Sequence, residues 1–228
     1  MAGVTDRPFR QLCRKSGAGL AVSEMVTSNA ALWSSRKTQH RPDHSGENSS
    51  HTIQIAWADP GKMTGAAQFK VNNGAEIIDI NMGCPAKKVC NVMTGSALLQ
   101  NVNITTSQRV ARVLQYTGAD GIMFGRAAQG NPWIFREIAH HLAIGEFLRP
   151  PSMDEICDIL VSHLQNLYEF YGEYMGVRIA RKHIGWYCKN KRDAKLFRAL
   201  VNKAETANEQ LQIVRGYFSG QKAQELAA

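Results

Sequence analysis

Residues 75–89 read AEIIDINMGCPAKKV, and no other part of the sequence says more about the architecture. Residues 75–80 are almost continuously apolar, which is typical of a short strand buried on both faces of a parallel sheet. Gly83 permits a sharp turn, while Pro85 fixes its own φ and restricts the backbone of Cys84. The stretch therefore predicts a buried strand with a thiol at its carboxyl end, where parallel βα folds place their chemistry. By itself, a lone cysteine is more often an inert packed residue.

Strand and helix patterns alternate on both sides of this stretch. Apolar runs predict further strands at residues 20–25, 52–57 and 121–124. We expect one helix with Pro8 in its first turn and another between residues 59 and 74. Short links between such units predict a parallel sheet of βα units, open or closed.

The pattern changes after about residue 135, where the strand signals stop. Helical periodicity then runs through residues 154–171, 177–189 and 194–218. The Pro150-Pro151 pair marks the predicted boundary. We therefore predict an α/β chain in two parts, with βα units over residues 1–149 and an all-α C-terminal domain over residues 150–228.

The chain of 228 residues is basic, with a formal net charge of +8 and a pI near 9.4. Such an excess fits a nucleic acid first, an anionic membrane second, or simply a solvated basic surface. No apolar run approaches the roughly 18 residues that a membrane span needs. The five cysteines lack metal-ligand spacing, so we expect free thiols, no metal site and a cytoplasmic protein.

Six segments of the chain follow one another in the order of a known family's motifs: residues 1–10, 23–25, 53–55, 79–89, 125–135 and 178–183. Together they resemble the tRNA-dihydrouridine synthases, and the overall pattern resembles the bacterial B-type enzymes most closely. That family consists of flavin enzymes that combine a TIM barrel with a C-terminal helical domain. The resemblance implies an incomplete TIM-type βα barrel over residues 1–149 and a helical tRNA-binding domain over residues 150–228.

The resemblance also implies a reaction. In the family, reduced FMN delivers hydride to C6 of a uracil, NADPH or NADH is the reductant, and a cysteine protonates C5. The resemblance makes Cys84 that general acid, and a thiol with a reference pKa of about 8.5 is mostly protonated at neutral pH. Because the target base must leave its stack to meet the flavin, a basic surface that grips tRNA fits this chemistry.

The resemblance assigns contacts to individual residues. The implied FMN-binding residues are Met1, Ala2, Gln54, Asn101, Gly125 and Arg126, and the implied tRNA-binding residues are Arg178, Arg181 and Lys182. Apart from the resemblance, a Gly-Arg pair between a strand and a helix suits a phosphate, although an isolated pair is usually an ordinary loop. The many basic residues between 178 and 203 are typical of RNA binding or of a solvated helix face.

Two departures from the family pattern concern the barrel. The chain starts inside the opening motif, so we expect the family's first strand to be missing. Residues 101–104 resemble a much later family segment of the form Asn-Gly-Asp-Ile, from which Val102 and Asn103 differ. We therefore expect a deletion junction near residues 100–101, with the loss of several βα units that carry a flavin-contacting lysine and a histidine. Counting agrees, since about 150 residues hold at most about five units of roughly 30 residues.

Three functional hypotheses follow from the sequence. The first is an incomplete, monomeric tRNA-dihydrouridine synthase, whose own activity we expect to be weak or absent. The second is a non-catalytic tRNA-binding remnant of such an enzyme. The third is a different flavin oxidoreductase, which residues 81–88 and the basic C-terminal helices disfavour.

Overall fold

The computed structural model describes residues 1, 3–28, 33, 42–47, 50–56, 60–81, 110–111, 114–115, 118 and 120–225. The contacts divide the chain into two compact units, Met1–Ile104 and Thr105–Ala228. The domain boundary that we expect from the sequence, between residues 149 and 150, stays a prediction.

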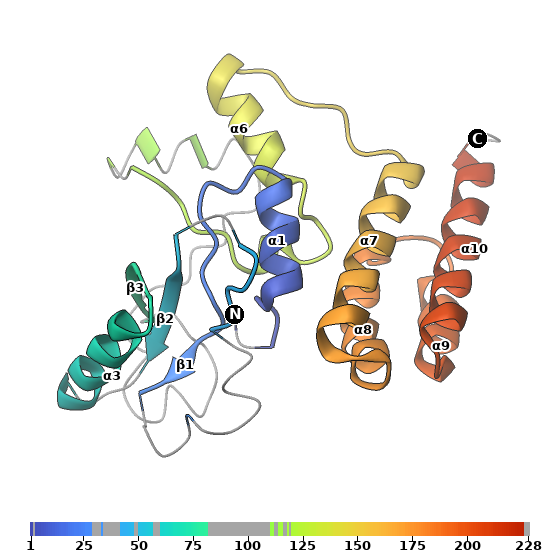
Figure 1. The fold of residues 1–228 in the computed structure, drawn as a ribbon. Helices are drawn as coiled ribbons and strands as arrows, with labels where there is room; N and C mark the ends of the chain where they lie inside the picture. The colour runs from blue at the N-terminus through green and yellow to red at the C-terminus, as the bar shows by residue number, and fades with distance from the viewer. Residues whose placement is uncertain are drawn as a thin grey trace. The chain divides into compact units, whose positions relative to one another are not determined.

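The first unit contains a parallel sheet (Figure 1). Its elements follow in the order α1 (Arg7–Lys15), β1 (Val26–Thr27), β2 (Thr52–Ala56), α3 (Pro60–Asn72) and β3 (Ile77–Ile80). The central strand, β2, pairs in parallel with β1 on one side and with β3 on the other. The prediction of an α/β chain with a parallel sheet is therefore confirmed in the described part.

Helix α1 begins where the sequence predicts. The side chain of Asp6 accepts a hydrogen bond from the backbone N–H of Phe9 at 3.1 Å, and a proline occupies the first turn. This cap satisfies an N–H that would otherwise have no partner within the helix, which contributes about 1 kcal/mol. Phe9, Leu12 and Cys13 then lie buried on one helical face, as expected from their spacing.

Helix α3 packs against one face of the sheet. Ile53 and Ile55 of β2 are two residues apart, so both point to that face. They form a buried cluster with Val26, against which Met63 and Ala67 of α3 pack. Each isoleucine fully removed from water contributes roughly 1.5–3 kcal/mol, so this contact stabilises the sheet.

Two strand predictions in this unit are wrong in part. Residues 20–25 form no strand, although Val22 makes a single parallel bridge to Thr52, and the strand proper, β1, begins later at Val26. The predicted burial of the next strand on both faces is also wrong, because Ile77 and Ile80 of β3 are 42% and 55% exposed. β3 lies at the edge of the sheet in the described part of the chain, so one neighbour fewer covers it.

The strand predicted at residues 121–124 does not form either. These residues have no regular secondary structure, and the side chain of Met123 is 65% exposed. A strand persists only where its backbone groups pair with a neighbour. The sheet described here consists of β1, β2 and β3, and residues 121–124 do not belong to it.

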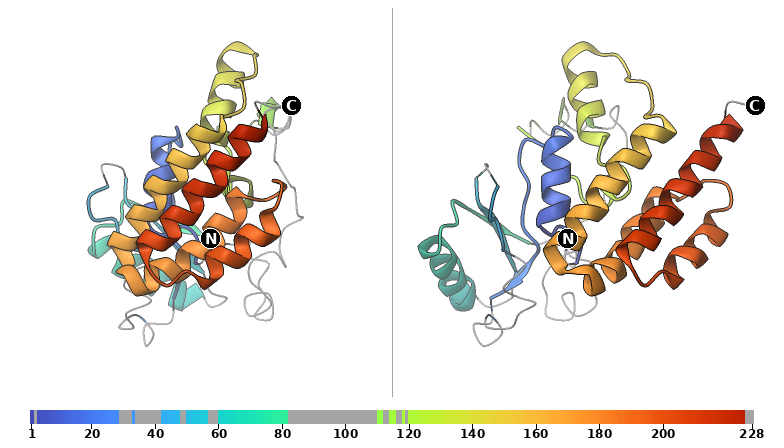
Figure 2. Two further views of the ribbon diagram at one scale, coloured as in Figure 1. Left: turned by 90° about the vertical axis from the view of Figure 1, so that its right-hand side faces the viewer. Right: turned by 45° about the vertical axis from the view of Figure 1, so that its right-hand side comes forward.

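The second unit is helical in its described C-terminal part. Its elements are η3 (Arg126–Ala128), α6 (Ile134–Ile144), α7 (Met153–Tyr171), α8 (Glu173–Tyr187), α9 (Ala194–Lys203) and α10 (Ala207–Glu225). Figure 2 shows α7 to α10 packed side by side. The periodicity of the sequence predicts α7 and α8 at about these positions. It does not predict α6, and it predicts one continuous helix where the structure has α9 and α10.

Helices α7 to α10 enclose one apolar core. Leu160, Leu164 and Leu167 of α7 are completely buried, as is Ile184 of α8. The two helices approach so closely at Gly176 that an added Cβ would lie 2.8 Å from the Cα of Tyr168. Among the helices that the structure describes, none is long and apolar enough to cross a membrane.

Candidate functional site

A partly buried polar cluster, with Gln54 as its buried member, stands at the carboxyl end of β3. The Gln54 side chain of β2 donates from Nε2 to Asp79 Oδ2, and its Oε1 accepts a hydrogen bond from Asn81 Nδ2 at 2.7 Å. Gln54 and Asp79 are register partners on neighbouring strands, so their side chains lie on the same face. The amide of Gln54 is thereby fixed in one orientation among a carboxylate and a second amide. This cluster can offer both donors and acceptors to a polar ligand.

The segment that precedes β1, residues 23–25, contacts the strand that carries Gln54. Ser23 is fully buried, and its hydroxyl accepts a hydrogen bond from the backbone N–H of Gln54 at 3.1 Å and donates to the carbonyl of Glu24 at 3.0 Å. Its own N–H donates to the carbonyl of Thr52 at 3.0 Å. Ser23 therefore binds to β2 beside Gln54, which gives the first residue of this motif a structural role.

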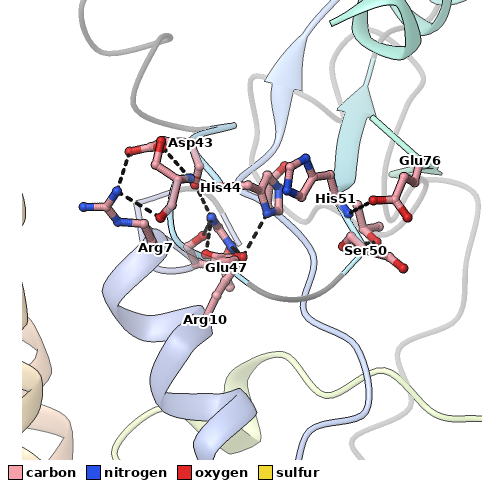
Figure 3. Close-up of polar contacts among 12 residues, drawn as sticks. Arg7, Arg10, Asp43, His44, Glu47, Ser50, His51 and Glu76 are labelled. Carbon is pink, nitrogen blue, oxygen red and sulfur yellow. Dashed lines mark hydrogen bonds and ion pairs between the residues drawn. The ribbon is translucent and has the colours of Figure 1, made fainter. Parts of the chain in front are cut away.

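The buried side chain of Arg10, on α1, binds the loop of residues 42–47 (Figure 3). Its guanidinium is almost completely buried and forms an ion pair with Glu47, at 2.8 Å between Nη2 and Oε1. Nη1 donates to the carbonyl of Thr5 at 2.9 Å, and Nη2 also donates to the carbonyl of Asp43. A buried guanidinium is tolerated only when such partners compensate its lost hydration, so these bonds fix residues 42–47 in place.

The electrostatics around Glu47 agree with that role. Burial raises the pKa of the Glu47 carboxyl, but hydrogen bonds from His44 and Arg10 outweigh burial and lower the pKa below its ordinary value. The Nδ1 atom of His44 lies 2.9 Å from Glu47 Oε2. Arg7 adds an ion pair with Asp43 at 3.3 Å on the same loop. This role of Arg10 is not predictable from the sequence, because Glu47 is distant in the chain and no residue spacing indicates the pair.

Met1 precedes this helix and belongs to the same unit as Gln54. Its ammonium group donates to Thr5 Oγ1 at 2.8 Å, and its carbonyl accepts hydrogen bonds from the N–H groups of Val4 and Thr5. Three other predicted site residues, Ala2, Cys84 and Asn101, lie outside the described residues. Of the predicted FMN set, the structure therefore describes Met1 and Gln54 in the first unit.

Gly125 and Arg126 fall in the second unit, where a short 3-10 turn presents the arginine. Gly125 precedes η3, and the side chain of Arg126 is exposed. The turn is anchored a few residues later at Gly130, whose φ is +67° and whose added Cβ would lie 2.5 Å from the carbonyl carbon of Trp186 in α8. A glycine is required there by both the backbone angle and the close approach. Sequence reasoning did not single out Gly130.

A basic groove opens between α8 and α9. It has a volume of about 310 Å³ and is lined by Arg181, Lys182, Gly185, Trp186, Arg198 and Asn202. None of these lining residues is acidic. The missing side chain of Gly185 leaves room for the stem of Arg198, whose Cδ would lie 3.7 Å from a Cβ at that position. The groove thus combines three cationic groups with one indole, a set that suits phosphate and base contacts.

The three predicted tRNA-binding residues lie on α8, and each also makes local contacts. The guanidinium of Arg178 stacks 3.6 Å from the ring centroid of Tyr174 and is exposed. Arg181 donates to the carbonyl of Ala204 at 3.0 Å, where α9 ends. Lys182 is half-buried, beside the buried His183. The structure brings Arg181 and Lys182 together in the groove. It adds Arg198 and Trp186, which belong to the basic stretch 178–203 and for which the sequence predicts no separate role.

The family model described as "Dihydrouridine synthase (Dus)" matches the chain in two segments, residues 1–104 and residues 100–225. The chain is 40% identical over 301 residues to tRNA-dihydrouridine synthase B of Xanthomonas axonopodis pv. citri, with 96% of this chain and 91% of the relative covered. The enzymes of the same name from Vibrio cholerae and Pseudomonas aeruginosa are each 39% identical, and the alignments cover 96% of this chain and 94% and 91% of the relatives.

The alignments with these relatives are longer than the chain itself. An alignment over 301 residues is longer than the 228 residues of this chain, so the relative contains residues that have no counterpart here. The two segments of the family match overlap at residues 100–104, beside the junction that the sequence predicts near residues 100–101.

Proposed function

The chain belongs to the dihydrouridine synthase family, and we propose that its chemistry is the reduction of uridine to 5,6-dihydrouridine in tRNA, with FMN as cofactor and NADPH or NADH as reductant. The observation that carries the proposal is the partly buried cluster of Gln54, Asp79 and Asn81. It stands at the carboxyl edge of a parallel sheet, where βα folds bind their ligands, and in the sequence it is followed by the Gly-Cys-Pro motif that contains Cys84.

The described residues fit the chemistry of a flavin mononucleotide. The edge of an isoalloxazine ring carries donors and acceptors, which the amides of Gln54 and Asn81 and the carboxylate of Asp79 can match. The exposed guanidinium of Arg126 suits the terminal phosphate. We assign Met1, Ala2, Asn101 and Gly125 to the same cofactor on the basis of the motifs alone. When bound, FMN supplies the hydride that reduces the uracil.

The chain itself supplies the proton. Addition of hydride at C6 turns the C5–C6 double bond into a single bond, and C5 must then take up a proton. We assign this proton to the Sγ of Cys84, which becomes a thiolate and is reprotonated from solvent. A proline restricts the backbone of the residue before it, so Pro85 is expected to limit the directions that the thiol of Cys84 can take.

The basic groove is the proposed tRNA surface. Arg181, Lys182 and Arg198 can neutralise backbone phosphates, and Trp186 offers an aromatic surface for a base. Arg178 extends the same positive potential along α8. The nearest basic residues of α9 and of the connection before it, among them Lys191, Arg192 and Lys195, carry it further. The groove supports tRNA over a membrane surface because it is concave and contains a stacking residue.

The proposal includes an architecture and a location. The βα units up to residue 149 would form an incomplete TIM-type barrel, and residues 150–228 would form the helical tRNA-binding domain. The parallel order of β1, β2 and β3 and the common core of α7 to α10 support this division. Its tRNA substrate and the free thiols of Cys13, Cys157 and Cys188 favour the cytoplasm.

A second candidate is a tRNA-binding protein of this family that has lost catalysis. Two observations favour it: the relatives contain residues that have no counterpart here, and the predicted strand at residues 121–124 is not formed. A closed barrel needs each strand to pair on both sides. With several units absent, the two halves of the FMN set would not be joined by a continuous sheet.

One experiment compares the chain with a restored version, in which the residues that the Xanthomonas axonopodis relative carries at this point are inserted between Gln100 and Asn101. We expect the restored chain to purify with flavin absorbance and to form dihydrouridine in unmodified tRNA with NADPH. The chain as it stands should bind tRNA with little flavin and no turnover. A folded, FMN-loaded restored chain without turnover would overturn the proposed function, whereas normal turnover by the 228-residue chain would exclude the second candidate.

A further inference from the structure

The first turn of α8 carries an exposed aromatic side chain that the helical core does not use. Tyr174 is 67% exposed, whereas Tyr187 on the same helix is buried. The hydroxyls of Tyr168 and Tyr217 donate hydrogen bonds within the helical unit. Those three tyrosines therefore stabilise the packing of α7 to α10. A single exposed ring is common on protein surfaces, so the meaning of Tyr174 depends on its neighbours.

Arg178 fixes a cation on the ring of Tyr174. Its guanidinium carbon lies 3.6 Å from the ring centroid, and its Nη1 donates to the backbone carbonyl of Tyr174 at 3.0 Å. The first contact is a cation–π interaction, and the hydrogen bond holds the guanidinium in that position. The adjacent acid, Glu173, accepts the backbone N–H of Ala207 at 2.8 Å and so holds the start of α10. Because the ring stays exposed with the guanidinium on it, the pair still offers surface to a further planar group.

Both residues lie on the face of α8 that lines the basic groove. An α-helix turns by about 100° per residue, so residues 174, 178, 181 and 185 fall within about 60° of one another. Arg181 and Gly185 line the groove, and Trp186 lines it beside them. At about 1.5 Å per residue, Tyr174 lies about 17 Å from Gly185 along the helix axis. The surface from Tyr174 to Trp186 therefore has an aromatic side chain near each end and basic side chains between them, and residues 174–186 contain no acid.

This composition fits a single-stranded region of a nucleic acid. Basic grooves with interleaved aromatic rings bind single strands, because the cations meet phosphates and the rings stack on bases. In an RNA double helix the bases already stack on one another, and the major groove is too deep and narrow for side chains to read. An aromatic side chain therefore stacks on a base in a loop, a bulge or an end. A phosphate contact alone would need the guanidinium of Arg178 and not the ring beneath it.

We propose that Tyr174 is a base-stacking residue of the tRNA surface: its ring stacks on an unpaired base of the tRNA, and Arg178 binds an adjacent phosphate. The inference rests on the proposed function, since it takes tRNA as the substrate. It extends that function by placing a single-stranded part of the tRNA at the amino end of α8. Tyr174 contributes to binding and takes no part in the chemistry.

Two substitutions of Tyr174 separate stacking from other roles of the side chain. Leucine is apolar but has no π-face, so Tyr174→Leu should lower the affinity for tRNA about 5- to 100-fold, the range expected for one stacked base. The slope of log affinity against log salt should stay unchanged, because no charge is lost, whereas Arg178→Ala should lower that slope by about 1. Tyr174→Phe keeps the ring and should keep the affinity. Filter binding of the full chain to an unmodified tRNA transcript at several salt concentrations measures both quantities.

Two comparisons make the test specific. Phe147→Leu removes an aromatic side chain that is 61% exposed outside α8, and it should leave the affinity for tRNA unchanged. A long RNA duplex has no unpaired base, so Tyr174→Leu should bind it as the wild type does. Circular dichroism identical to the wild type establishes that each variant is folded, and Tyr174→Gln carries the test if Tyr174→Leu unfolds.

The outcomes distinguish this inference from the proposed function. A folded Tyr174→Leu chain with wild-type affinity for tRNA, an equal loss of affinity for the duplex, or an equal loss in Phe147→Leu would overturn the stacking role and leave the proposed function standing. A wild-type chain that does not bind tRNA would overturn both the stacking role and the proposed tRNA surface. If the restored chain binds tRNA and FMN but forms no dihydrouridine, only the proposed reaction fails.

Discussion

Acid should unfold the helical unit through two buried histidines. His163 of α7 and His183 of α8 are buried in the core with ring centroids 4.7 Å apart, and the ring of Trp186 lies 5.0 Å from that of His183. Burial, together with the positive charge of Lys182, lowers the pKa of His163 to about 3. Burial, His163 and Lys182 lower the pKa of His183 well below its ordinary value.

The sign of the effect follows from these directions. Below pH 6.5 the unfolded chain binds protons at both histidines, while the folded chain binds them only at a lower pH. The stabilisation is therefore complete above about pH 6.5 and falls by about 1.4 kcal/mol per pH unit for each histidine below it. For His163 alone, with its folded pKa of about 3, the loss reaches about 2 kcal/mol at pH 5.

The measurement is urea unfolding of the full chain at pH 7, 6 and 5, followed by circular dichroism and tryptophan fluorescence. His163→Leu keeps the site apolar and should remove about 2 kcal/mol of the acid sensitivity between pH 7 and pH 5. His141→Leu is the matched control, because His141 lies outside this core and stacks on the exposed Phe147. An unchanged free energy of unfolding at pH 5, or equal acid sensitivity in His163→Leu, would refute the reasoning.

Three further predictions concern single residues. Arg198→Ala should weaken tRNA binding and lower the slope of log affinity against log salt by about 1, since it removes one phosphate contact. Arg215 is exposed on α10 outside the groove, so Arg215→Ala should leave both the affinity and the slope unchanged. Filter binding at several salt concentrations measures both quantities for each variant. In the restored chain, Cys84→Ala should keep FMN but form no dihydrouridine, and normal turnover would exclude Cys84 as the acid. Gly176→Ala should destabilise the chain by about 1–3 kcal/mol in thermal or urea unfolding, because its Cβ would meet the backbone of α7, whereas Gly216→Ala, with open space around it, should not.

Helix starts are predictable from the sequence because their causes are local. Asp6 and the proline after it announce α1, and the structure has the cap that they imply. The same kind of signal was present but overlooked between α9 and α10. Thr206 and Glu209 have the spacing of a capping box, and Thr206 Oγ1 accepts the N–H of Glu209 at 3.2 Å where α10 begins. Reading that pattern would have divided residues 194–218 into two helices.

The site is predictable to the extent that a motif names single residues. Gln54 was singled out by its motif and lies in a partly buried polar cluster, while its role as an FMN contact stays a prediction. The partners that hold the site could not be predicted. Arg10 pairs with Glu47 across a long stretch of chain, and Gly130 packs against the backbone of Trp186. Such contacts depend on the folded arrangement, and periodicity or capping rules contain no information about them.

Strands differ from helices in this respect, and the difference explains where the sequence analysis failed. A helix satisfies its backbone within its own segment, so α7 to α10 form irrespective of what is missing elsewhere in the chain. A strand needs a neighbouring strand to complete its backbone hydrogen bonds. Its sequence therefore predicts only that the segment can pair, and not that it does. β2 has two neighbours and buries its isoleucines, β3 has one described neighbour and leaves Ile80 exposed, and residues 121–124 form no strand. This gradation is what the loss of βα units between β3 and residue 121 would produce. In the described part of the chain, the failed strand predictions therefore agree with the finding that the relatives contain residues without a counterpart here.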